Sequence, residues 1–256
     1  MPSRQHTSPS ISVVLPAYNE EAIIERTVLH VADVLSGQTS DFEIIVSNDG
    51  SRDNTAGVLA RLEQRQPDLH LRVVTHERNH GYGAAVASGF DAARKELVFM
   101  TDGDKQFDVT ELVEFLEAMD PRTDLVIGWR RKRADPAMRK LNALGWKTLV
   151  NLLFGYTARD VDCAFKLFRR RVWESMTVQS RGATFSAEFL IKARRLGFHV
   201  KELPVSHFPR TAGSPTGARP DVIVRAFVEL FTLWRNLSRD MRTDPRVREK
   251  HRLLND

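Results

Sequence analysis

The chain has a single cysteine, Cys163, among its 256 residues. One thiol cannot form a disulfide framework within the chain or a cysteine-rich zinc site, so we expect a protein of a reducing compartment. No apolar run approaches the roughly 18–20 residues that cross a bilayer. The first residues, MPSRQHTSPS, have no apolar stretch after the basic ones, which argues against a secretory signal. These absences predict a cytoplasmic protein that is at most peripheral at the cytoplasmic face of a membrane.

Two patterns of nucleotide and nucleic-acid binding are also missing. No G-x-G-x-x-G follows the first apolar run, and the glycines of GYGAAVASG, residues 81–89, have the wrong spacing for a dinucleotide fingerprint. No predicted strand combines basic residues with aromatic ones on which bases could stack. We therefore expect no nucleic-acid partner.

Positive charge is abundant and unevenly spread. The formal net charge is +5, and the segment 130–140 holds six basic residues against one acidic residue, Asp135. Such a cluster favours a phosphate-bearing ligand, although solvated loop charge is the simpler alternative. We favour the ligand for 130–140. For the basic segment 239–252 we favour a solvated tail.

Short apolar runs that end in polar residues alternate with helical patterns in the first half of the chain. Strands are predicted at 11–18, 42–51, 71–77, 97–104 and 124–129, and helices at 20–35, 54–66, 83–94 and 108–119. This alternation predicts an α/β fold with a mostly parallel, Rossmann-like sheet flanked by helices. Ligands of such sheets bind beyond the carboxyl ends of the strands, so residues 16–20, 47–51 and 102–106 are expected along one edge.

The second half is less regular and ends in an amphipathic pattern. We predict helices at 138–154 and 185–195, strands at 163–170 and 199–205, and a loop at 207–220. The predicted helix 221–237 has a narrow polar stripe and a wide apolar face that includes Phe231 and Trp234. Such a helix lies in a bilayer interface or packs on the domain or on a partner, and the sequence leaves both open.

The stretch FMTDGDKQF, residues 99–107, places two carboxylates and an amide at the end of a buried strand. Where the chain turns, Asp102, Asp104 and Gln106 can converge on one cation. Carboxylate and amide oxygens are hard ligands that suit Mg²⁺ or Mn²⁺. The alternative is a solvated acidic turn that caps the following helix at Asp108.

Two further strand ends are expected at the same edge. Asp49 follows the second strand, where a buried carboxylate can accept hydrogen bonds from a base or a ribose. Its alternative role is helix capping, for which Ser51, Asp53 and Asn54 are also suited. Tyr18 follows the first strand and either packs on a base or fills the protein interior.

Four stretches in this order and spacing, VVLPAYNEE, FEIIVSNDGSRDNT, NHGYGAAVASGF and FMTDGDKQF, resemble the family 2 glycosyltransferases with the GT-A fold. Within that family the sequence is most similar to polyprenyl-phosphate sugar synthases of the dolichyl-phosphate mannose synthase type. The resemblance implies a GT-A domain at 11–215. It would follow a disordered lead at 1–10 and precede an amphipathic helix with a basic tail at 216–256.

The resemblance also implies a set of site residues, carried over by position. It implies a metal-dependent enzyme that inverts the anomeric carbon of a hexose in one displacement, with a GDP- or UDP-linked sugar as donor. The implied nucleoside contacts are Pro16, Tyr18, Glu20, Ser47 and Asp49. The implied diphosphate site is Asp102, Gly103, Asp104 and Gln106, with Mg²⁺ or Mn²⁺ on Asp102, Asp104 and Gln106. Arg130 and Arg210 would meet the donor, and Arg139 would meet a lipid phosphate.

Departures from the family pattern gather on the acceptor side. Ala143 replaces a small hydroxyl residue, DVDCAFK at 160–166 replaces the usual D-x-T-S-G-F-K, and the late loop lacks its lysine, for which Arg219 is a substitute. The acceptor therefore stays open. A polyprenyl phosphate would be positioned by Arg133, Arg139 and Lys140 and needs no base. A hydroxyl acceptor needs one, and Asp160 or Asp162 is the candidate. A non-catalytic nucleotide-sugar-binding protein is the remote third possibility.

Overall fold

The computed structural model describes residues 9–103, 105–131, 137–209 and 220–243. Within these ranges, the side chains of residues 137–143, 220–225 and 238–243 are not described.

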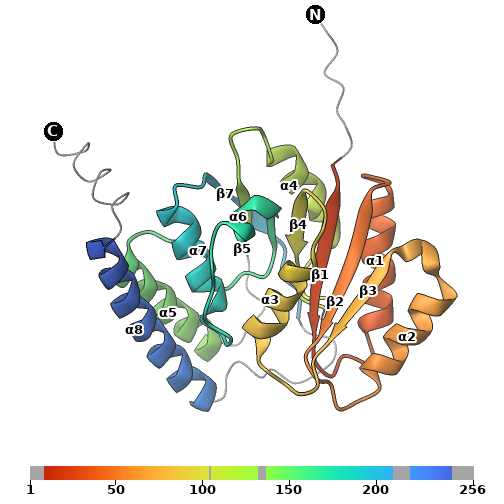
Figure 1. The fold of residues 1–256 in the computed structure, drawn as a ribbon, viewed down its shortest axis with the longest axis horizontal. Coiled ribbons are helices and arrows are strands. Elements are labelled where there is room, and N and C mark those ends of the chain that lie inside the picture. Colours follow the sequence, from red (N-terminus) through yellow and green to blue (C-terminus); the bar gives the residue numbers. More distant parts are fainter. Residues whose placement is uncertain (1–8, 104, 132–136, 210–219, 244–256) are drawn as a thin grey trace, which may run out of the picture.

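In the described part of the chain a seven-stranded sheet forms the centre of the molecule (Figure 1). Its strands are β1 (Ile11–Ala17), β2 (Phe42–Asn48), β3 (Leu71–Thr75), β4 (Leu97–Met100), β5 (Leu125–Arg130), β6 (Lys166–Arg169) and β7 (Val200–Val205), in the order β3-β2-β1-β4-β6-β5-β7. β6 runs antiparallel to both of its neighbours, and the other paired strands are parallel. The predicted mostly parallel α/β fold is thus confirmed.

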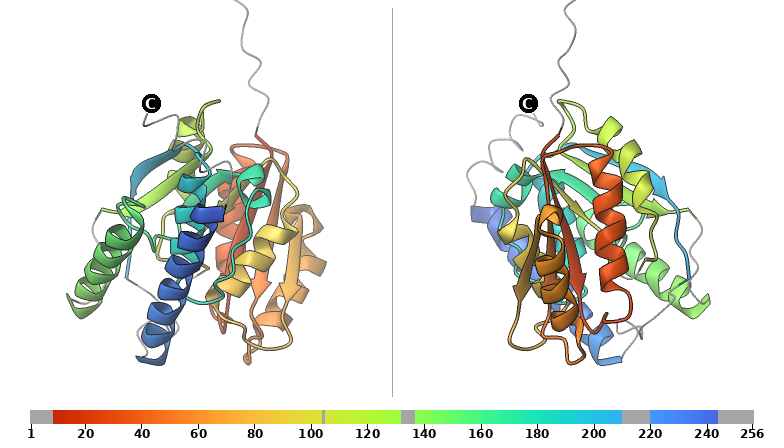
Figure 2. Two further views of the ribbon diagram at one scale, coloured as in Figure 1. Left: turned by 60° about the vertical axis from the view of Figure 1, so that its left-hand side comes forward. Right: turned by 90° about the vertical axis from the view of Figure 1, so that its right-hand side faces the viewer.

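Helices cover both faces of this sheet (Figure 2). The helices α1 (Ile24–Ser36) and α2 (Thr55–Arg65) connect β1 to β2 and β2 to β3, so right-handed crossovers place them on one face. On the other face α3 (Tyr82–Ala92) returns the chain from β3 to β4 and packs against β1, β2 and α7 (Phe185–Arg195). The remaining helices are α4 (Leu112–Ala118), α5 (Ala137–Phe154), α6 (Arg170–Glu174) and α8 (Pro220–Thr243), with 3₁₀ turns η1 (Pro67–Leu69) and η2 (Val109–Glu111).

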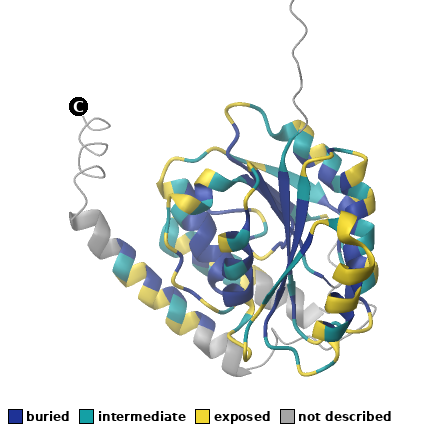
Figure 3. Cartoon of the chain, turned by 45° about the vertical axis from the view of Figure 1, so that its right-hand side comes forward, coloured by how far each residue is buried: buried dark blue, intermediate teal, exposed yellow. Residues whose placement is uncertain are grey.

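The core is built from strands that are buried on both faces. Ile11, Val13, Val14 and Leu15 of β1 have no exposed surface, and β1 is accordingly apolar except for the buried Ser12. Figure 3 shows the buried strands enclosed by helices with exposed outer faces. Phe90 of α3 joins an aromatic cluster with Phe168, Trp173 and Phe189, which fixes α3 against β6, α6 and α7.

Several predicted boundaries differ from the structure; for example, the strands predicted at 42–51 and 97–104 end at Asn48 and Met100. The helix predicted at 20–35 begins at Ile24, because residues 19–21 hydrogen-bond to the loop after β2. The helix predicted at 108–119 opens with the 3₁₀ turn η2, where the Asp108 side chain accepts from the Thr110 amide. The strand predicted at 163–170 is shorter, because β6 begins at Lys166 and α6 follows directly.

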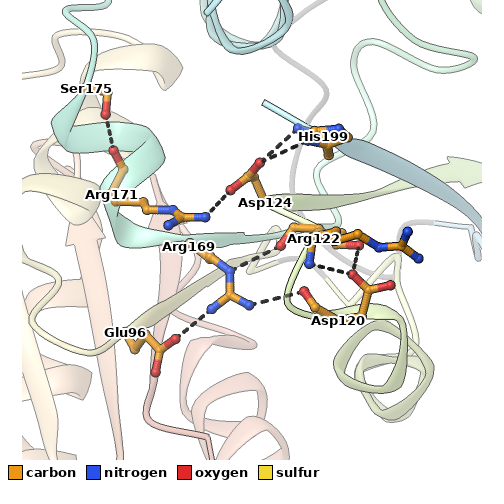
Figure 4. Close-up of polar contacts among 9 residues, drawn as sticks. Glu96, Asp120, Arg122, Asp124, Arg169, Arg171, Ser175 and His199 are labelled. Carbon is orange, nitrogen blue, oxygen red and sulfur yellow. Dashed lines mark hydrogen bonds and ion pairs between the residues drawn. The ribbon is translucent and has the colours of Figure 1, made fainter. Parts of the chain in front are cut away.

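Charged side chains link the elements at the amino ends of β4 and β5 (Figure 4). Asp124 accepts from the His199 amide at 2.9 Å and from Arg171 at 2.6 Å. Arg169 reaches Glu96 at 2.7 Å and the Thr123 and Asp120 carbonyls at 3.2 Å each. Burial alone would raise the pKa of Asp124, but the His199 amide and Arg171 lower it overall. This network ties β4, β5, β6, α6 and β7 together.

Helix α8 lies beside α5 at the side of the molecule (Figure 2). Trp146 of α5 meets Phe227 of α8 edge-on, with ring centroids 6.0 Å apart. Among the described side chains of α8, residues 226–237, the buried ones are Ala226, Leu230, Leu233 and Leu237. Among the residues that the structure describes, no helix combines the length and apolar character needed to cross a membrane.

Candidate active site

The loops that follow β1 and β2 are joined to each other by side-chain hydrogen bonds. The backbone amide of Asn19 donates to Ser51 Oγ at 2.9 Å. The side-chain oxygen Asn19 Oδ1 accepts from the backbone amide of Arg52 at 2.8 Å. The Glu20 amide donates to Thr55 Oγ1 at 3.0 Å. Asn19 adopts a left-handed backbone with φ of 57°, which asparagine tolerates better than most residues. These bonds hold the loops that follow β1 and β2 next to each other, at the bottom of Figure 1.

Asp49 is buried at this edge and holds the loop after β3. Its Oδ1 accepts from His76 Nδ1 at 2.7 Å and from the His80 amide at 2.9 Å, and its Oδ2 accepts from the Gly81 amide at 2.9 Å. The residue is 2% exposed. On the far side of the imidazole, His76 Nε2 lies 2.8 Å from Ser88 Oγ. Helix capping, the alternative for Asp49, falls instead to Asp53, whose carboxylate accepts from the Thr55 amide.

The other predicted nucleoside contacts lie around Asp49. Pro16 pairs with Ser47 across β1 and β2, and the Asp49 amide donates to the Ala17 carbonyl at 2.9 Å. Tyr18 and Glu20 follow in the partly exposed loop after β1. The Ser47 hydroxyl is buried, with no hydrogen-bond partner among the described residues. The structure thus brings Pro16, Ser47 and Asp49 to one place.

The acidic stretch begins where β4 ends. Asp102 is partly exposed, and Tyr82 Oη donates to its Oδ1 at 3.2 Å. Thr27 Oγ1 of α1 donates to the Gly103 carbonyl at 2.9 Å. A side chain at Gly103 would meet the Pro16 carbonyl at 3.4 Å and Ile24 at 3.6 Å, which are ordinary contacts. Packing within the protein therefore does not require glycine at position 103.

The end of the acidic stretch makes a tight turn. Lys105 adopts a left-handed backbone with φ of 58°, an uncommon conformation for lysine. Gln106 Nε2 donates to the Phe208 carbonyl at 3.1 Å, and the Phe208 amide donates to the Gln106 carbonyl at 2.8 Å. Gln106 thus ties this turn to the segment that leads into residues 210–219.

The side chains present here have the chemistry of a hard-metal site. Mg²⁺ is typically held by one or two carboxylates together with substrate phosphates and water, so Asp102 with a second carboxylate suits it. Among the described residues, which do not include Asp104, no group of three or more His, Cys, Asp or Glu side chains is placed to bind a metal.

Arg130 and Asp160 form a buried ion pair at the end of β5. Arg130 Nε and Nη2 each lie 2.7 Å from an oxygen of Asp160, and the two side chains are 9% and 12% exposed. Burial alone would lower the pKa of Arg130, but the Asp160 carboxylate raises it overall. This bidentate contact keeps both charges in place, and it occupies both carboxylate oxygens of Asp160.

Behind this pair lies a buried lysine. Lys166, 2% exposed, pairs with Met100 of β4 and Ile127 of β5, and its ammonium group contacts the Cys163 carbonyl. Burial lowers the pKa of Lys166 and raises the pKa of the Cys163 thiol to about 12, so the thiol stays protonated at neutral pH. Asp162, in contrast, is exposed.

Several predicted site residues fall outside what the structure describes. Asp104, Arg133 and Arg210 lie outside the described residues. Arg139 and Lys140 belong to α5, but their side chains are not described. The roles assigned to these residues remain predictions.

Three residues that the structure brings to the site have no role predicted from the sequence. Tyr82 lies within the glycine-rich stretch NHGYGAAVASGF, and that position is the signal that could have identified it. Thr27, which holds the Gly103 carbonyl, and His76, which holds Asp49, carry no signal in one sequence, because their partners are 76 and 27 positions away.

Comparison with known proteins finds relatives of similar sequence. The chain is 28% identical over 235 residues to undecaprenyl-phosphate 4-deoxy-4-formamido-L-arabinose transferase of Shewanella sediminis, covering 92% of this chain and 67% of that one. It is 30% identical over 211 residues to dodecaprenyl-phosphate galacturonate synthase of Rhizobium johnstonii, covering 80% of this chain and 61% of that one. The chain therefore spans about three fifths to two thirds of the length of these relatives.

A solved structure supports the fold. Glucosyl-3-phosphoglycerate synthase from Mycobacterium tuberculosis, crystallised with Mn²⁺, UDP and phosphoglyceric acid, superposes with a TM-score of 0.67 at 21% identity, covering 88% of this chain and 78% of that one. This likeness confirms the predicted GT-A fold. The model of the family "Glycosyl transferase family 2" matches residues 12–176, which is more than half of the sequence. The chain therefore belongs to glycosyl transferase family 2.

Proposed function

We propose that the protein transfers a hexose from a nucleotide-sugar to a polyprenyl phosphate, inverting the anomeric carbon, with Mg²⁺ or Mn²⁺ on Asp102, Asp104 and Gln106. The observation that carries the proposal is the placement of Asp102 at the end of β4, one strand from the Arg130–Asp160 pair at the end of β5. A carboxylate site for a metal and a fixed guanidinium thus follow two parallel strands at one edge of the sheet, with the antiparallel strand β6 between them. This is where α/β sheets bind their ligands.

Each residue of this edge has a definable task. The metal, when bound, would offset negative charge on the departing nucleoside diphosphate. Tyr82 orients the Asp102 carboxylate, and Thr27 fixes the Gly103 backbone beside it. Asp160 holds the Arg130 guanidinium in one orientation, where it is available to the donor phosphate or sugar. Such groups act by being in place before the reaction begins.

The Arg130–Asp160 pair also bears on the acceptor. A general base must be able to take a proton, and a carboxylate with both oxygens on one guanidinium is a poor proton acceptor. A phosphate acceptor is already ionised near neutral pH and needs no base. The relatives of Shewanella sediminis and Rhizobium johnstonii are named for undecaprenyl and dodecaprenyl phosphate, and this supports a polyprenyl phosphate here.

A hydroxyl acceptor is the second candidate, and one observation favours it. Asp162 is exposed, two residues after the ion-paired Asp160, and its carboxylate would then be the base that accepts a proton from a hydroxyl group. In that case Asp162→Asn would abolish transfer. If the acceptor is a phosphate, the same variant keeps most of its activity.

A lipid acceptor would bring the enzyme to a membrane, and we propose that α8 and the tail, as a unit at 216–256, make that contact. Phe227, Val228, Phe231 and Trp234 of α8 are exposed, and the rings of Phe231 and Trp234 lie 5.7 Å apart. Exposed aromatic side chains on a helix next to a basic segment suit an anionic membrane surface.

Flotation with anionic vesicles tests this contact. Phe231→Glu combined with Trp234→Glu should abolish flotation. Thr232→Glu, which adds a negative charge at an exposed polar position of the same helix, should reduce it only slightly. Equal flotation of wild type and the double variant would reject the membrane contact.

The function itself is tested by incubating the protein with Mn²⁺, radiolabelled nucleotide-sugars and either purified polyprenyl phosphate or the matching polyprenol. We expect label to enter the organic phase with the phosphate and not with the polyprenol. Asp102→Asn serves as the inactive control. Label that stays in water with every donor, although the nucleotide-sugar is consumed, would reject the polyprenyl phosphate as acceptor.

A further inference from the structure

Asp49 has hydrogen-bonding capacity left for only one donor. A carboxylate offers about four acceptor positions, two on each oxygen. Both positions on Oδ1 are used, one by His76 Nδ1 at 2.7 Å and one by the His80 amide at 2.9 Å. One position on Oδ2 is used by the Gly81 amide at 2.9 Å. Only the second position on Oδ2 remains.

We propose that this single free acceptor position on Asp49 makes the donor site selective for uridine over guanosine. His76 is then the residue that sets the selectivity. The inference rests on the proposed function, in which Asp49 receives the base of the nucleotide-sugar. Guanine presents two adjacent donors, N1–H and N2–H, and needs one acceptor position on each carboxylate oxygen. Uracil presents one donor on that edge, its N3–H, and needs a single position.

The surroundings of Asp49 make a mismatch costly. The residue is 2% exposed, and a bound base would cover what remains, so a donor of the base left unpaired there would be shielded from water. Both the backbone and the side chain of Asp49 are held in place. The Asp49 amide donates to the Ala17 carbonyl, and the Asp49 carboxylate accepts from the His80 and Gly81 amides of the loop after β3. Gly50 lets the Arg78 backbone pack directly against this loop, since a side chain at position 50 would meet it at 2.4 Å. The carboxylate cannot rotate to offer guanine a second oxygen without breaking these bonds.

His76 is the one side chain among the three donors to Asp49. Its ring is held from the other side by Ser88, 2.8 Å from Nε2. The two backbone amides cannot be removed by substitution, but the imidazole can. His76→Phe removes the donor to Oδ1 and keeps a ring of similar size. His76→Asn keeps a side-chain N–H donor. Ser88→Ala removes only the bond on the far side of the ring.

The test measures the dissociation constants of UDP and GDP by calorimetry in the presence of Mn²⁺, on the full chain. We expect wild type to bind UDP at least about tenfold tighter than GDP, the cost of one unpaired buried donor. His76→Phe should bring the two constants to within about threefold. His76→Asn and Ser88→Ala should keep the wild-type ratio.

Each other outcome has a defined meaning. Equal or tighter binding of GDP by wild type overturns the inference and leaves the proposed function standing. If the ratio of the GDP to the UDP dissociation constant is as large in His76→Phe as in wild type, His76 is not the cause of the selectivity. Failure of wild type to bind either nucleotide in the presence of Mn²⁺ overturns the proposed function itself. If His76→Phe does not fold, the wild-type ratio still decides between uridine and guanosine.

Discussion

Strand β5 has an arginine–carboxylate contact at each of its two ends, and the two contacts differ. At its amino end, Asp124 is bonded to the His199 amide and to Arg171, whose side chain is 61% exposed. At its carboxyl end, Arg130 and Asp160 are both nearly buried. In the first contact the carboxylate is buried but the guanidinium belongs to a side chain that is largely exposed to water. The second holds two charges in place where water is scarce.

The carboxyl edge also carries features that a purely structural contact does not need. Asn19 and Lys105 have left-handed backbones there, and the Ser47 and Thr101 hydroxyls are buried without partners among the described residues. At the amino edge the corresponding cases are the left-handed His70 and the buried Arg170 Nε. Strain and unmet hydrogen bonds cost stability and persist where function requires them. The comparison therefore predicts that substitutions at the carboxyl edge reduce activity more than stability, and that those at the amino edge do the reverse.

The largest effect on activity is expected for Asp102→Asn. The change keeps the shape of the side chain and removes the charge that a divalent metal requires. Turnover should fall by about 10³-fold while the midpoint of thermal unfolding changes little, because Asp102 is partly exposed. Steady-state kinetics at saturating Mn²⁺ and calorimetry make the two measurements.

Asp108→Asn is the matched control, because Asp108 is an acidic residue of the same region whose carboxylate caps η2. It should keep activity within about twofold, since asparagine is also a good N-cap. A comparable loss of activity in both variants would show that the acidic stretch acts through folding.

A smaller loss of activity is expected for Arg130→Lys. Lysine keeps the positive charge but cannot make the bidentate contact with both Asp160 oxygens. We expect turnover to fall about 10- to 100-fold. Arg171→Lys, the same change at the amino end of β5, should leave turnover unchanged. Equal effects of the two variants would remove the distinction between the two ends.

Asp124→Asn should reduce stability without reducing the activity of folded protein. The pKa of Asp124 is lowered in the folded state, so its charge stabilises the fold above its ordinary pKa of about 4, and this contribution is lost as pH falls through the folded pKa. At pH 7 the variant should lose about 2 kcal/mol of unfolding free energy. The difference from wild type should shrink below about pH 4. Urea unfolding at several pH values measures it, and a difference independent of pH would contradict the assignment.

The smallest effect is expected for Tyr82→Phe. It removes the hydroxyl that donates to Asp102 at 3.2 Å and leaves the ring in place. The apparent Mn²⁺ constant should rise about three- to tenfold with little change in turnover at saturating metal. An unchanged constant would show that Tyr82 does not orient Asp102.

The sequence was sufficient to predict the sheet and the edge at which several of the predicted site residues lie. The apolar strands and the helices between them place Pro16, Ser47 and Asp49 together, because parallel strands end at the same side of a sheet. The three acidic and amide positions 102, 104 and 106 follow β4 for the same reason. These features are local patterns repeated along the chain, and local patterns can be recognised in one sequence.

The contacts that orient the site could not be predicted. Asp160 was a candidate base, but its carboxylate is held by Arg130, 30 positions away. Asp49 was expected to be available to a ligand, but three donors from the loop after β3 use most of its capacity. Such pairings depend on how loops pack, and no periodicity in the sequence records them. The antiparallel β6 was likewise hidden, because a short apolar run does not show its direction.

The central claim is that a divalent ion binds at the end of β4. A crystal of the protein soaked with Mn²⁺ and a nucleoside diphosphate, measured at the manganese absorption edge, tests it most directly. The account predicts an anomalous peak in contact with an Asp102 carboxylate oxygen and with phosphate oxygens. A peak and a diphosphate bound together at another surface, with Asp102 contacting neither, would contradict it.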